Sequence, residues 1–489
     1  MLAAISTATL TGAVGRPVSV EVHVSNGLPG FTIVGLPDAA VRESRDRVRA
    51  ALLSSGLPWP LRRVTVNLAP SGVRKGGAGL DLAIALGVLV ACGELDPGCT
   101  DGLAFCGELG LNGALRHVPG MIALADATAP LGLVVPLSDM REAALVRGRG
   151  AHGVATLAAL ARILRGQGEW PDAPSSPAPP APDAAPDLAD VRGQPVGRHA
   201  LEVAAAGAHH LLMVGPPGSG KTMLAQRLPG LLPALTPAEA LTVTRIHSTA
   251  GCPLPEDALV SHPPYRAPHH RSSIVALVGG GSWSLRPGEV SLATHGVLFL
   301  DEMGEFPVAA LEALRQPLEE GVIRVSRAGG TVTFPAHFLL VGAMNPCPCG
   351  EGVYEGACAC TEVARARYSR RLSAPLLDRF DLVVPLSRPD PDDLLSDVPG
   401  EPSAAVAARV ESARRRAAAR MPGEEPPMHR DGARLLAARL RGGHLSARGL
   451  HKVSRVARTV ADLLGAERVG EDHVSDALSL RTARATVAP

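Results

Sequence analysis

Residues 211–225, LLMVGPPGSGKTMLA, restrict the fold of this chain more than any other stretch. The first four are apolar and predict a short buried strand. Residues 215–222 then match the phosphate-loop pattern G-x-x-x-x-G-K-[ST], and apolar residues continue at helical spacing to position 228. A glycine-rich turn that matched by chance would lack the strand before it and the helix after it. The stretch therefore predicts an α/β core with a nucleoside-triphosphate site.

Each residue type in the loop has a physical task at a triphosphate. We expect Gly215, Gly218 and Gly220 to adopt positive φ, which turns successive backbone N–H groups toward phosphate oxygens. The helix N-terminus adds its dipole. Lys221 adds a point charge for the β and γ phosphates, and Thr222 a hydroxyl for Mg²⁺. The residues predicted to bind ATP here are Gly215, Pro216, Pro217, Gly218, Ser219, Gly220, Lys221, Thr222 and Met223.

Two further apolar runs end in polar residues that suit ATP hydrolysis. Residues 297–302, VLFLDE, predict a strand followed by Asp301, which would hold Mg²⁺ through water, and Glu302, which would orient and deprotonate the attacking water. Residues 338–345 end in Asn345, whose amide would position that water and sense the γ phosphate. Strands ending in acidic residues are common, and it is the phosphate loop that favours hydrolysis here.

Arg379 follows a predicted helix and precedes a predicted strand. A guanidinium at this place fits an arginine finger, which a subunit supplies to the nucleotide of its neighbour. Arg370 and Arg371 are rivals for that role. The alternative for Arg379 is a salt bridge to Asp378 or Asp381.

Four of the eight cysteines form two C-x-C pairs, Cys347 with Cys349 and Cys358 with Cys360. Four thiolates within one glycine-rich loop suit a tetrahedral Zn²⁺ site. The usual spacing is longer, C-x₂₋₄-C, so plain reduced thiols are the alternative.

Length and charge limit the classes to which the protein can belong. A chain of 489 residues predicts roughly three domains of about 150 residues each. The net charge of +1 argues against a surface generally coated by nucleic acid, though not against a local basic pore.

No basic and apolar leader opens the chain, and the longest apolar run, residues 82–92, is too short to span a bilayer. We expect a cytoplasmic protein without membrane partners.

The segment before a proline-rich linker at 169–186 predicts an α/β domain at 1–168. Residues 67–85 and 107–113 resemble the Lon-protease-like domain of Mg-chelatase-related proteins, which implies a ribosomal S5-like fold. Where Lon proteases carry a serine and a lysine, this chain has Gly79 and Ile122, which provide neither nucleophile nor base. The domain is therefore expected to be proteolytically inactive, with Lys75 on the surface or in a turn. The predicted strands are 18–24, 31–34, 64–68 and 103–109, and the predicted helices 38–54, 80–91 and 119–128.

The phosphate loop, the acidic strand end, Asn345 and Arg379 occur in the order of an AAA+ ATPase. Four long motifs resemble those of the Mg-chelatase-like YifB/ComM family, which narrows the resemblance from AAA+ ATPases in general to this family. It implies a P-loop core with a parallel sheet at 187–390 and a helical lid at 391–489, in which Arg448 would reach the γ phosphate as a second sensor. The family motifs lie at 266–273, 277–281, 286–292 and 344–350, and the last opens the cysteine loop at 347–360.

The same resemblance implies a partner and an assembly. Members of the family are expected to form rings, most simply hexamers, that drive DNA branch migration or unwinding in recombination or natural transformation. A protein-remodelling ATPase and a magnesium-chelatase motor subunit are the alternatives.

Residues 322–334 predict a β-hairpin that turns at 328–330. The related clade carries a pore hairpin at this place, so Arg324 and Arg327 are candidates to track DNA phosphates through the ring. A surface hairpin whose arginines are merely solvated is the alternative.

The insertion at 248–281 contains His269, His270 and Arg271, which we expect to contact DNA or a neighbouring subunit. Metal binding by the two histidines is not expected, because adjacent side chains rarely converge and no carboxylate or thiol lies at a suitable spacing.

Overall fold

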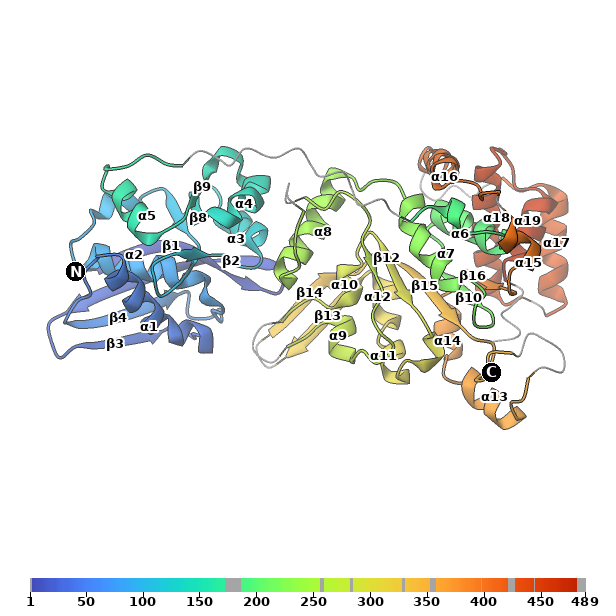
Figure 1. Ribbon diagram of the computed structural model, residues 1–489, viewed down its shortest axis with the longest axis horizontal. Coiled ribbons are helices and arrows are strands. Elements are labelled where there is room, and N and C mark those ends of the chain that lie inside the picture. The colour runs from blue at the N-terminus through green and yellow to red at the C-terminus, as the bar shows by residue number, and fades with distance from the viewer. Residues whose placement is uncertain are drawn as a thin grey trace.

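The computed structural model describes residues 2–171, 186–255, 259–281, 285–327, 330–351, 358–396, 398–420, 427–443 and 445–481, without the side chains of 327 and 330. Most of the predicted linker, the predicted hairpin tip and the end of the predicted lid lie outside these residues. Three regions follow one another along the long axis of the molecule: an N-terminal α/β region, a central α/β core and C-terminal helices (Figure 1).

The N-terminal region is built on a mixed seven-stranded sheet in the order β3-β4-β2-β1-β5-β8-β9. Strand β2 is antiparallel to its neighbours β1 and β4, whereas β3 pairs in parallel with β4, and β5, β8 and β9 are parallel to one another. Every residue of α2 is buried, so this helix is the centre of the regional core. The strands are β1 (Leu2–Thr11), β2 (Val14–Ser25), β3 (Gly30–Val34), β4 (Arg63–Ala69), β5 (Leu103–Phe105), β8 (Gly132–Pro136) and β9 (Ala151–Val154), beside a small ribbon of β6 (Glu108–Leu109) and β7 (Leu115–Arg116). The helices are α1 (Ala39–Ser54), α2 (Asp81–Ala91), α3 (Met121–Ala127), α4 (Met140–Arg147) and α5 (Leu157–Leu164).

The strand predicted at 103–109 is in fact two strands, β5 and β6. Between them Gly107 leaves the sheet: its N–H donates to the Gly79 carbonyl at 2.9 Å, and its carbonyl accepts from Leu82 N at 3.1 Å. These two hydrogen bonds fasten Gly107 to the turn that precedes α2. Strand propensity cannot reveal them, because they join residues that are distant in the sequence.

Lys75 is not a surface residue, as the sequence had suggested, but fully buried. Its ammonium donates to the Pro70 carbonyl, and its backbone N–H donates to Leu36 O at 3.2 Å. A buried ammonium needs such an acceptor, because burying a charged group without a partner is costly.

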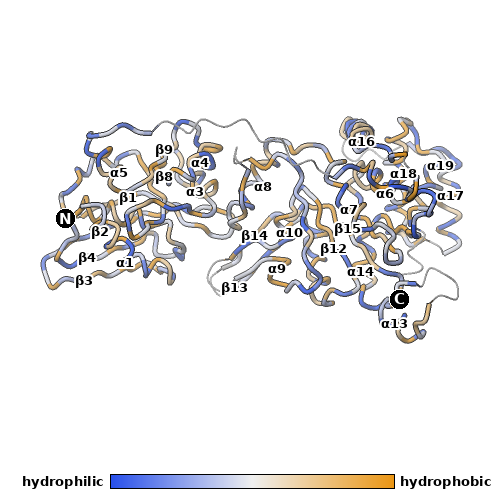
Figure 2. Tube along the Cα trace, viewed as in Figure 1, coloured by the Kyte–Doolittle hydropathy of each residue, from blue (hydrophilic) through white to orange (hydrophobic). Residues whose placement is uncertain are grey.

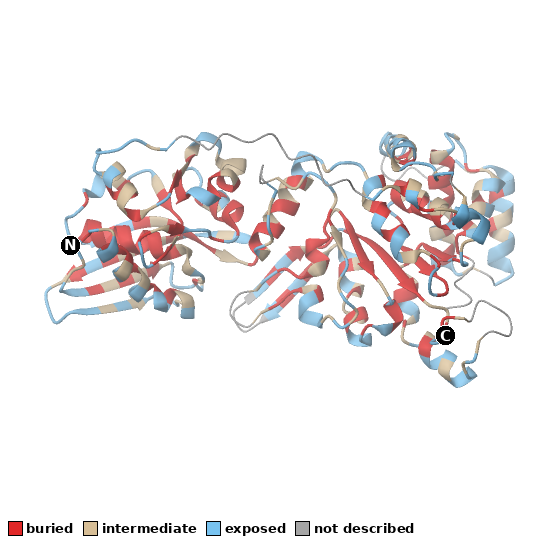
Figure 3. Cartoon of the chain, in the orientation of Figure 1, coloured by how far each residue is buried: buried red, intermediate tan, exposed pale blue. Residues whose placement is uncertain are grey.

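The central core is a five-stranded parallel sheet in the order β11-β12-β15-β10-β16. All residues of β10, β12 and β15 are buried between helices, and β12 and β15 are largely hydrophobic (Figures 2 and 3). The strand that leads into the phosphate loop is therefore central. The strands are β10 (Leu211–Val214), β11 (Tyr265–Arg266), β12 (Val297–Leu300), β15 (Leu339–Met344) and β16 (Leu382–Pro385), and the separate hairpin consists of β13 (Val322–Arg327) and β14 (Gly330–Pro335). The helices are α6 (Pro195–Gly207), α7 (Lys221–Arg227), α8 (Pro237–Ala250), α9 (Ile274–Val278), α10 (Glu289–Leu292), α11 (Val308–Glu312), α12 (Arg315–Glu320), α13 (Glu362–Ser369) and α14 (Ala374–Leu377).

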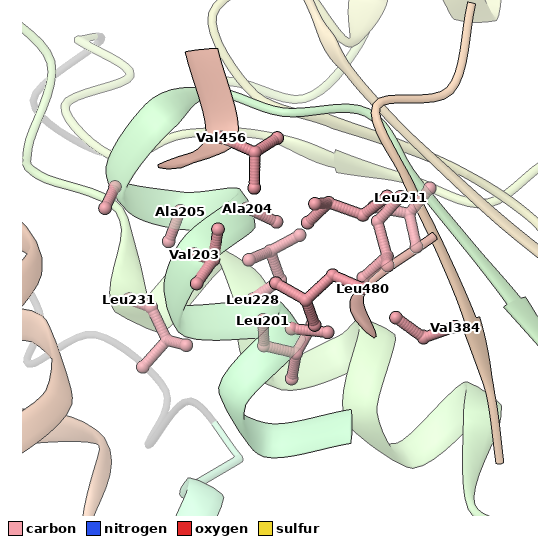
Figure 4. Packing of buried hydrophobic residues seen from close by; sticks show 14 of the residues in the cluster. Leu201, Val203, Ala204, Ala205, Leu211, Leu228, Leu231, Val384, Val456 and Leu480 are labelled. Carbon is pink, nitrogen blue, oxygen red and sulfur yellow. The ribbon is translucent and has the colours of Figure 1, made fainter. Parts of the chain in front are cut away.

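The C-terminal region is helical and shares a hydrophobic core with the sheet. Val456 of α18 and Leu480 pack toward Leu201 of α6 and Leu211 of β10 (Figure 4). The helices therefore cannot move as a unit without disturbing α6, which packs behind the central strand. They are α15 (Pro391–Leu395), α16 (Ser403–Ala418), α17 (Arg430–Arg441), α18 (Ala447–Leu463) and α19 (Glu471–Ser479). Throughout the described ranges, none of the helices has the length and hydropathy needed to traverse a bilayer.

Candidate nucleotide site and cysteine cluster

The phosphate loop begins at the buried end of β10. Gly218 and Gly220 both have φ +80°, a conformation that favours glycine. The positive φ expected of Gly215 is wrong; its lack of a side chain matters because a Cβ there would lie 2.4 Å from the Leu386 carbonyl oxygen. Two of the glycines therefore shape the loop, and the third lets β16 approach it.

Lys221, the first residue of α7, is held at the centre of the loop. Its Nζ donates to the carbonyls of Gly215 and Pro216 at 2.7 and 2.9 Å, and to Ser219 Oγ at 3.3 Å. It also lies 3.4 Å from Oδ1 of Asn345, which directly follows β15. Burial lowers the pKa of the ammonium from its ordinary value. The loop thus places a partly desolvated cation where the sequence predicts the β and γ phosphates.

The two carboxylates after β12 have different environments. The Thr222 hydroxyl donates to Asp301 Oδ2 at 2.8 Å, and the Glu302 backbone N–H donates to Asp301 Oδ1 at 2.9 Å. A threonine hydroxyl beside a carboxylate is the pair of oxygen ligands that phosphate-loop sites use for Mg²⁺, so the donor set fits this ion. Glu302 has φ +50°, an uncommon conformation for a residue with a side chain, and it directs its carboxylate away from Asp301 toward His270.

His270 is a site residue that the sequence did not assign to the nucleotide. Its Nδ1 lies 3.0 Å from Glu302 Oε2. The histidine belongs to the loop after β11, and β11 pairs in parallel with β12, so both loops emerge at the same edge of the sheet. In the sequence, the only sign that His270 lies at the nucleotide site was a short strand followed by two histidines. The loops enclose a cavity of about 330 Å³, lined by Thr222, Tyr265, His269, His270, Asp301 and Glu302.

Arg379 lies in the turn between α14 and β16, and its guanidinium pairs with Glu319 of α12. Asp381, one of the partners weighed from the sequence, pairs with Lys452 Nζ at 3.0 Å. Burial and then the charge of Arg448 lower the pKa of Arg379. Within the described residues, no hydrogen bond or ion pair joins either arginine to the phosphate loop.

The rival Arg371 is bound within its own subunit. Its guanidinium donates to the Gly304 carbonyl at 2.6 Å and to Glu305 at 2.9 Å. Arg370 is exposed at the end of α13. Arg379 is likewise paired, with Glu319, so these contacts leave Arg370 a candidate beside Arg379.

The four clustered cysteines come together in space, with all Sγ atoms within 4.8 Å of one another. Cys347 Sγ lies 3.3 Å from Cys349 and 3.6 Å from Cys358, and Cys349 lies 3.7 Å from Cys358. Zinc–sulfur bonds of about 2.3 Å in a tetrahedron place the sulfurs about 3.8 Å apart, so the cluster has the dimensions of a Zn(Cys)₄ site. A backbone hydrogen bond involving Glu351 and one from Cys347 lower the pKa of Cys349 to about 6. Cys360 completes the set.

The cysteine turn lies against the phosphate loop. Gly350 N donates to the Cys347 carbonyl at 3.0 Å, and a Cβ added at Gly350 would lie 2.6 Å from Pro217 Cδ. Asn345 precedes the same turn by two residues. The geometry therefore joins the candidate metal site to the nucleotide site.

The predicted hairpin is present as β13 and β14, paired from Val322 opposite Pro335 to Arg327 opposite Gly330. Arg324, on β13, is half exposed and pairs with Glu320 at the end of α12, four residues earlier in the chain. The side chain of Arg327 lies outside the described residues. Val325 and Phe334 point to the other, buried face.

A central phosphate-loop strand in a five-stranded parallel sheet defines an α/β protein with an AAA+-like core and a helical C-terminal region. Three family models match in chain order: "Subunit ChlI of Mg-chelatase" at residues 20–138, "Magnesium chelatase, subunit ChlI" at 187–394, and "Magnesium chelatase, subunit ChlI C-terminal" at 400–481. Such a Mg-chelatase-type AAA+ core implies an ATPase.

Full-length relatives identify the family. An uncharacterised protein of Mycobacterium tuberculosis is 45% identical, over 96% of each chain. The competence protein ComM of Haemophilus influenzae is 41% identical, over 95% of this chain and 94% of its own. The uncharacterised protein YifB of Escherichia coli is also 41% identical, over 98% and 97%. The chain belongs to the Mg-chelatase ChlI-like proteins of the YifB/ComM family. A probable DNA helicase, MCM9 of Arabidopsis thaliana, is 26% identical over 37% of this chain and 23% of its own.

Because Gly350 packs against Pro217 of the phosphate loop, we expect a side chain at position 350 to disturb nucleotide binding. Gly350→Ala should weaken MgATP binding by about tenfold, because the new Cβ collides with the phosphate loop and a side chain at positive φ is strained by about 1–3 kcal/mol. Gly443→Ala is the matched control, since Gly443 also has positive φ but nothing within 4 Å of an added Cβ. Titration with a fluorescent ATP analogue measures both, and equal affinities would remove the proposed link between the turn and the loop.

Proposed function

We propose that the protein is an ATP-driven motor that acts on DNA as a ring of identical subunits, expected to be a hexamer, with branch-migration or helicase activity. The observation that carries ATP hydrolysis is the convergence of Lys221, Thr222, Asp301, Glu302 and Asn345 at one edge of the parallel sheet. Mg²⁺, held by Thr222 and Asp301, would neutralise phosphate charge and orient the triphosphate.

Glu302 is proposed to accept the proton of the attacking water. Its Oε2 lies 3.0 Å from His270 Nδ1, so the histidine would orient the carboxylate while the other oxygen accepts the proton. Lys221 would neutralise charge on the β and γ phosphates, and Asn345, beside it, would hold the water in line.

Arg379 is proposed to act at the nucleotide of the adjacent subunit, and Arg448 to reach the γ phosphate as a second sensor. Within the described residues, Arg379 has no hydrogen bond or ion pair to its own phosphate loop, which supports its assignment to the neighbour. The site would then be complete only in an assembled ring.

DNA is the proposed substrate because of two relatives and one hairpin. One full-length relative is a competence protein, and a partial relative is a probable DNA helicase. Arg324 lies on the exposed face of the β13–β14 hairpin, where it could contact phosphates. Recombination or natural transformation is the process proposed, in the cytoplasm.

The N-terminal region is proposed to be Lon-protease-like and proteolytically inactive. A Cβ at Gly79 would lie 3.0 Å from Val118 Cγ1, and Ile122 is fully buried, so neither position presents a reactive group.

Forked or three-stranded DNA should stimulate ATP hydrolysis, and the protein should displace or exchange strands with ATP. DNA affinity should fall steeply across a salt series, because binding to phosphates releases counterions. Arg324→Glu should reduce the stimulation and lower the salt slope by about one. Arg415→Glu is the matched control, since this exposed arginine also pairs with a glutamate four residues earlier, Glu411, but lies on α16, far from the hairpin in sequence.

Two outcomes of this assay would contradict the proposal. Stimulation by unfolded protein but by no DNA would favour a protein-remodelling motor. ATP-driven insertion of Mg²⁺ into a porphyrin would favour a chelatase motor.

Mixing two inactive variants tests the shared site. Lys221→Ala and Arg379→Ala should each hydrolyse ATP far more slowly, the second by about 10³–10⁵, the range for arginine fingers. A mixture should regain activity, because an Arg379→Ala subunit keeps its own loop and receives Arg379 from a Lys221→Ala neighbour. Lys221→Ala mixed with Glu302→Gln should stay inactive, since no interface then has a complete site. Recovery in that control, or none in the first mixture, would exclude a finger at Arg379.

The cysteine cluster is proposed to hold one structural Zn²⁺ through Cys347, Cys349, Cys358 and Cys360. The purified protein should contain about one zinc per chain, and the double variant Cys358→Ser, Cys360→Ser almost none. Cys92→Ser, which changes an exposed cysteine outside the cluster, is the control. Equal, near-zero zinc in all three proteins, measured by mass spectrometry of the metal, would refute the site.

A further inference from the structure

The turn between β1 and β2 reaches out of the N-terminal region and touches the β13–β14 hairpin (Figure 1). Gly12, with φ +63°, is so close that a Cβ would lie 2.0 Å from Val332 Cγ1 and 3.3 Å from Phe334 Cζ. Ala13 is 6% exposed and belongs to the same hydrophobic cluster as Val332 and Phe334, although every other member of that cluster comes from the central core. The tip of one hairpin therefore packs on part of the apolar face of the other, beside residues of the central core.

A second contact fixes the orientation of the two regions. Gly120, at the start of α3, donates its N–H to the Ser248 carbonyl of α8 at 3.1 Å. The Ser248 hydroxyl donates to the buried carboxylate of Glu142, which also accepts from Ile122 N at 3.0 Å. Burial raises the pKa of Glu142. An ion pair of Arg245 with Asp126, 3.0 Å apart, lies beside this contact.

The turn and α3 form one rigid piece. A Cβ at Gly15, in β2, would lie 2.0 Å from the Ala123 carbonyl oxygen, so strand and helix are in direct backbone contact. Consequently the turn cannot shift on the hairpin unless α3 also shifts on α8.

The hairpin needs outside support. Among the residues that the structure describes, it is a two-stranded sheet that pairs with no further strand, and such ribbons are marginally stable alone. One face carries Arg324 and is exposed, and the other is apolar and buried. What covers the apolar face therefore decides where the arginine face points.

We propose that the N-terminal region positions the DNA hairpin: Gly12 and Ala13 are positioning residues that brace β13–β14 from behind so that its arginine face is presented to the polynucleotide. This rests on the proposed function for the identity of the ligand, but the brace itself does not. Bracing the β13–β14 hairpin would give the N-terminal region, which is proposed to lack protease activity, a role in the motor.

Ala13→Asp in the full chain tests the brace, because a carboxylate is costly to bury in the hydrophobic cluster that holds Ala13 with Val332 and Phe334, and the turn is expected to lift. Val14→Asp is the matched control, since Val14 is the next residue and is exposed. Amide hydrogen exchange over residues 322–327 and 330–335 should accelerate in Ala13→Asp and not in Val14→Asp. DNA stimulation of ATP hydrolysis should fall about fivefold or more in Ala13→Asp alone, the size of typical coupling between sites, with hydrolysis without DNA unchanged.

The outcomes separate the brace from the ligand. Unchanged exchange in Ala13→Asp overturns the brace. Faster exchange with full DNA stimulation overturns its role in positioning. If the unaltered protein is not stimulated by DNA, the proposed ligand fails, while faster exchange in Ala13→Asp alone still supports a braced hairpin.

Discussion

The whole site depends on the pairing of β10 with β15 on one side and β16 on the other. Leu211 lies opposite both Val341 and Leu382, so the three strands run in step and their carboxyl ends meet at one edge. The phosphate loop and Asn345 leave the sheet there, and β12 adds Asp301 beyond β15. Groups separated by more than a hundred residues thus come within hydrogen-bond distance, because hydrogen bonds between strands fix where each chain exits.

Strand ends were the predictable part of this arrangement. A buried parallel strand is a continuous apolar run, so the polar residue that follows it, such as Asp301 or Asn345, can be located from sequence. Sheet order and the partner of each side chain cannot, because they depend on contacts between distant segments. His270 was placed in the right loop without its partner Glu302, and Arg379 was weighed against two local aspartates although Glu319 pairs with it. β1 was not predicted, since its small alanine, serine and threonine residues give a weak apolar alternation.

The three lysines show why Lys75 was misjudged. Each ammonium donates to main-chain carbonyls: Lys75 to Pro70, Lys221 to Gly215 and Pro216, and Lys452 to Arg379 and Phe380 at 2.9 and 3.2 Å. An ammonium is a compact charge on a flexible stem, so a main-chain carbonyl can receive it in a narrow buried space. Arginines of this chain use carbonyls as well, since Arg198 donates to the carbonyls of Leu188, Val191 and Glu401. The burial of Lys75 therefore depends on how distant segments fold around it and could not be inferred from its residue type.

The contacts of Lys452 tie Arg379, the proposed finger, to the rest of its subunit. Lys452 of α18 holds the carbonyl of Arg379 and the carboxylate of Asp381, directly before β16. At the far end of this four-residue strand, Leu386 donates to the Val214 carbonyl, and its own carbonyl backs Gly215. The strand spans about 13 Å. A displacement of the phosphate loop that moves β16 must therefore move the anchor of Arg379 as well, and Lys452 conveys the same shift to the C-terminal helices. In a ring where Arg379 acts on the adjacent nucleotide, one short strand would thus connect successive sites.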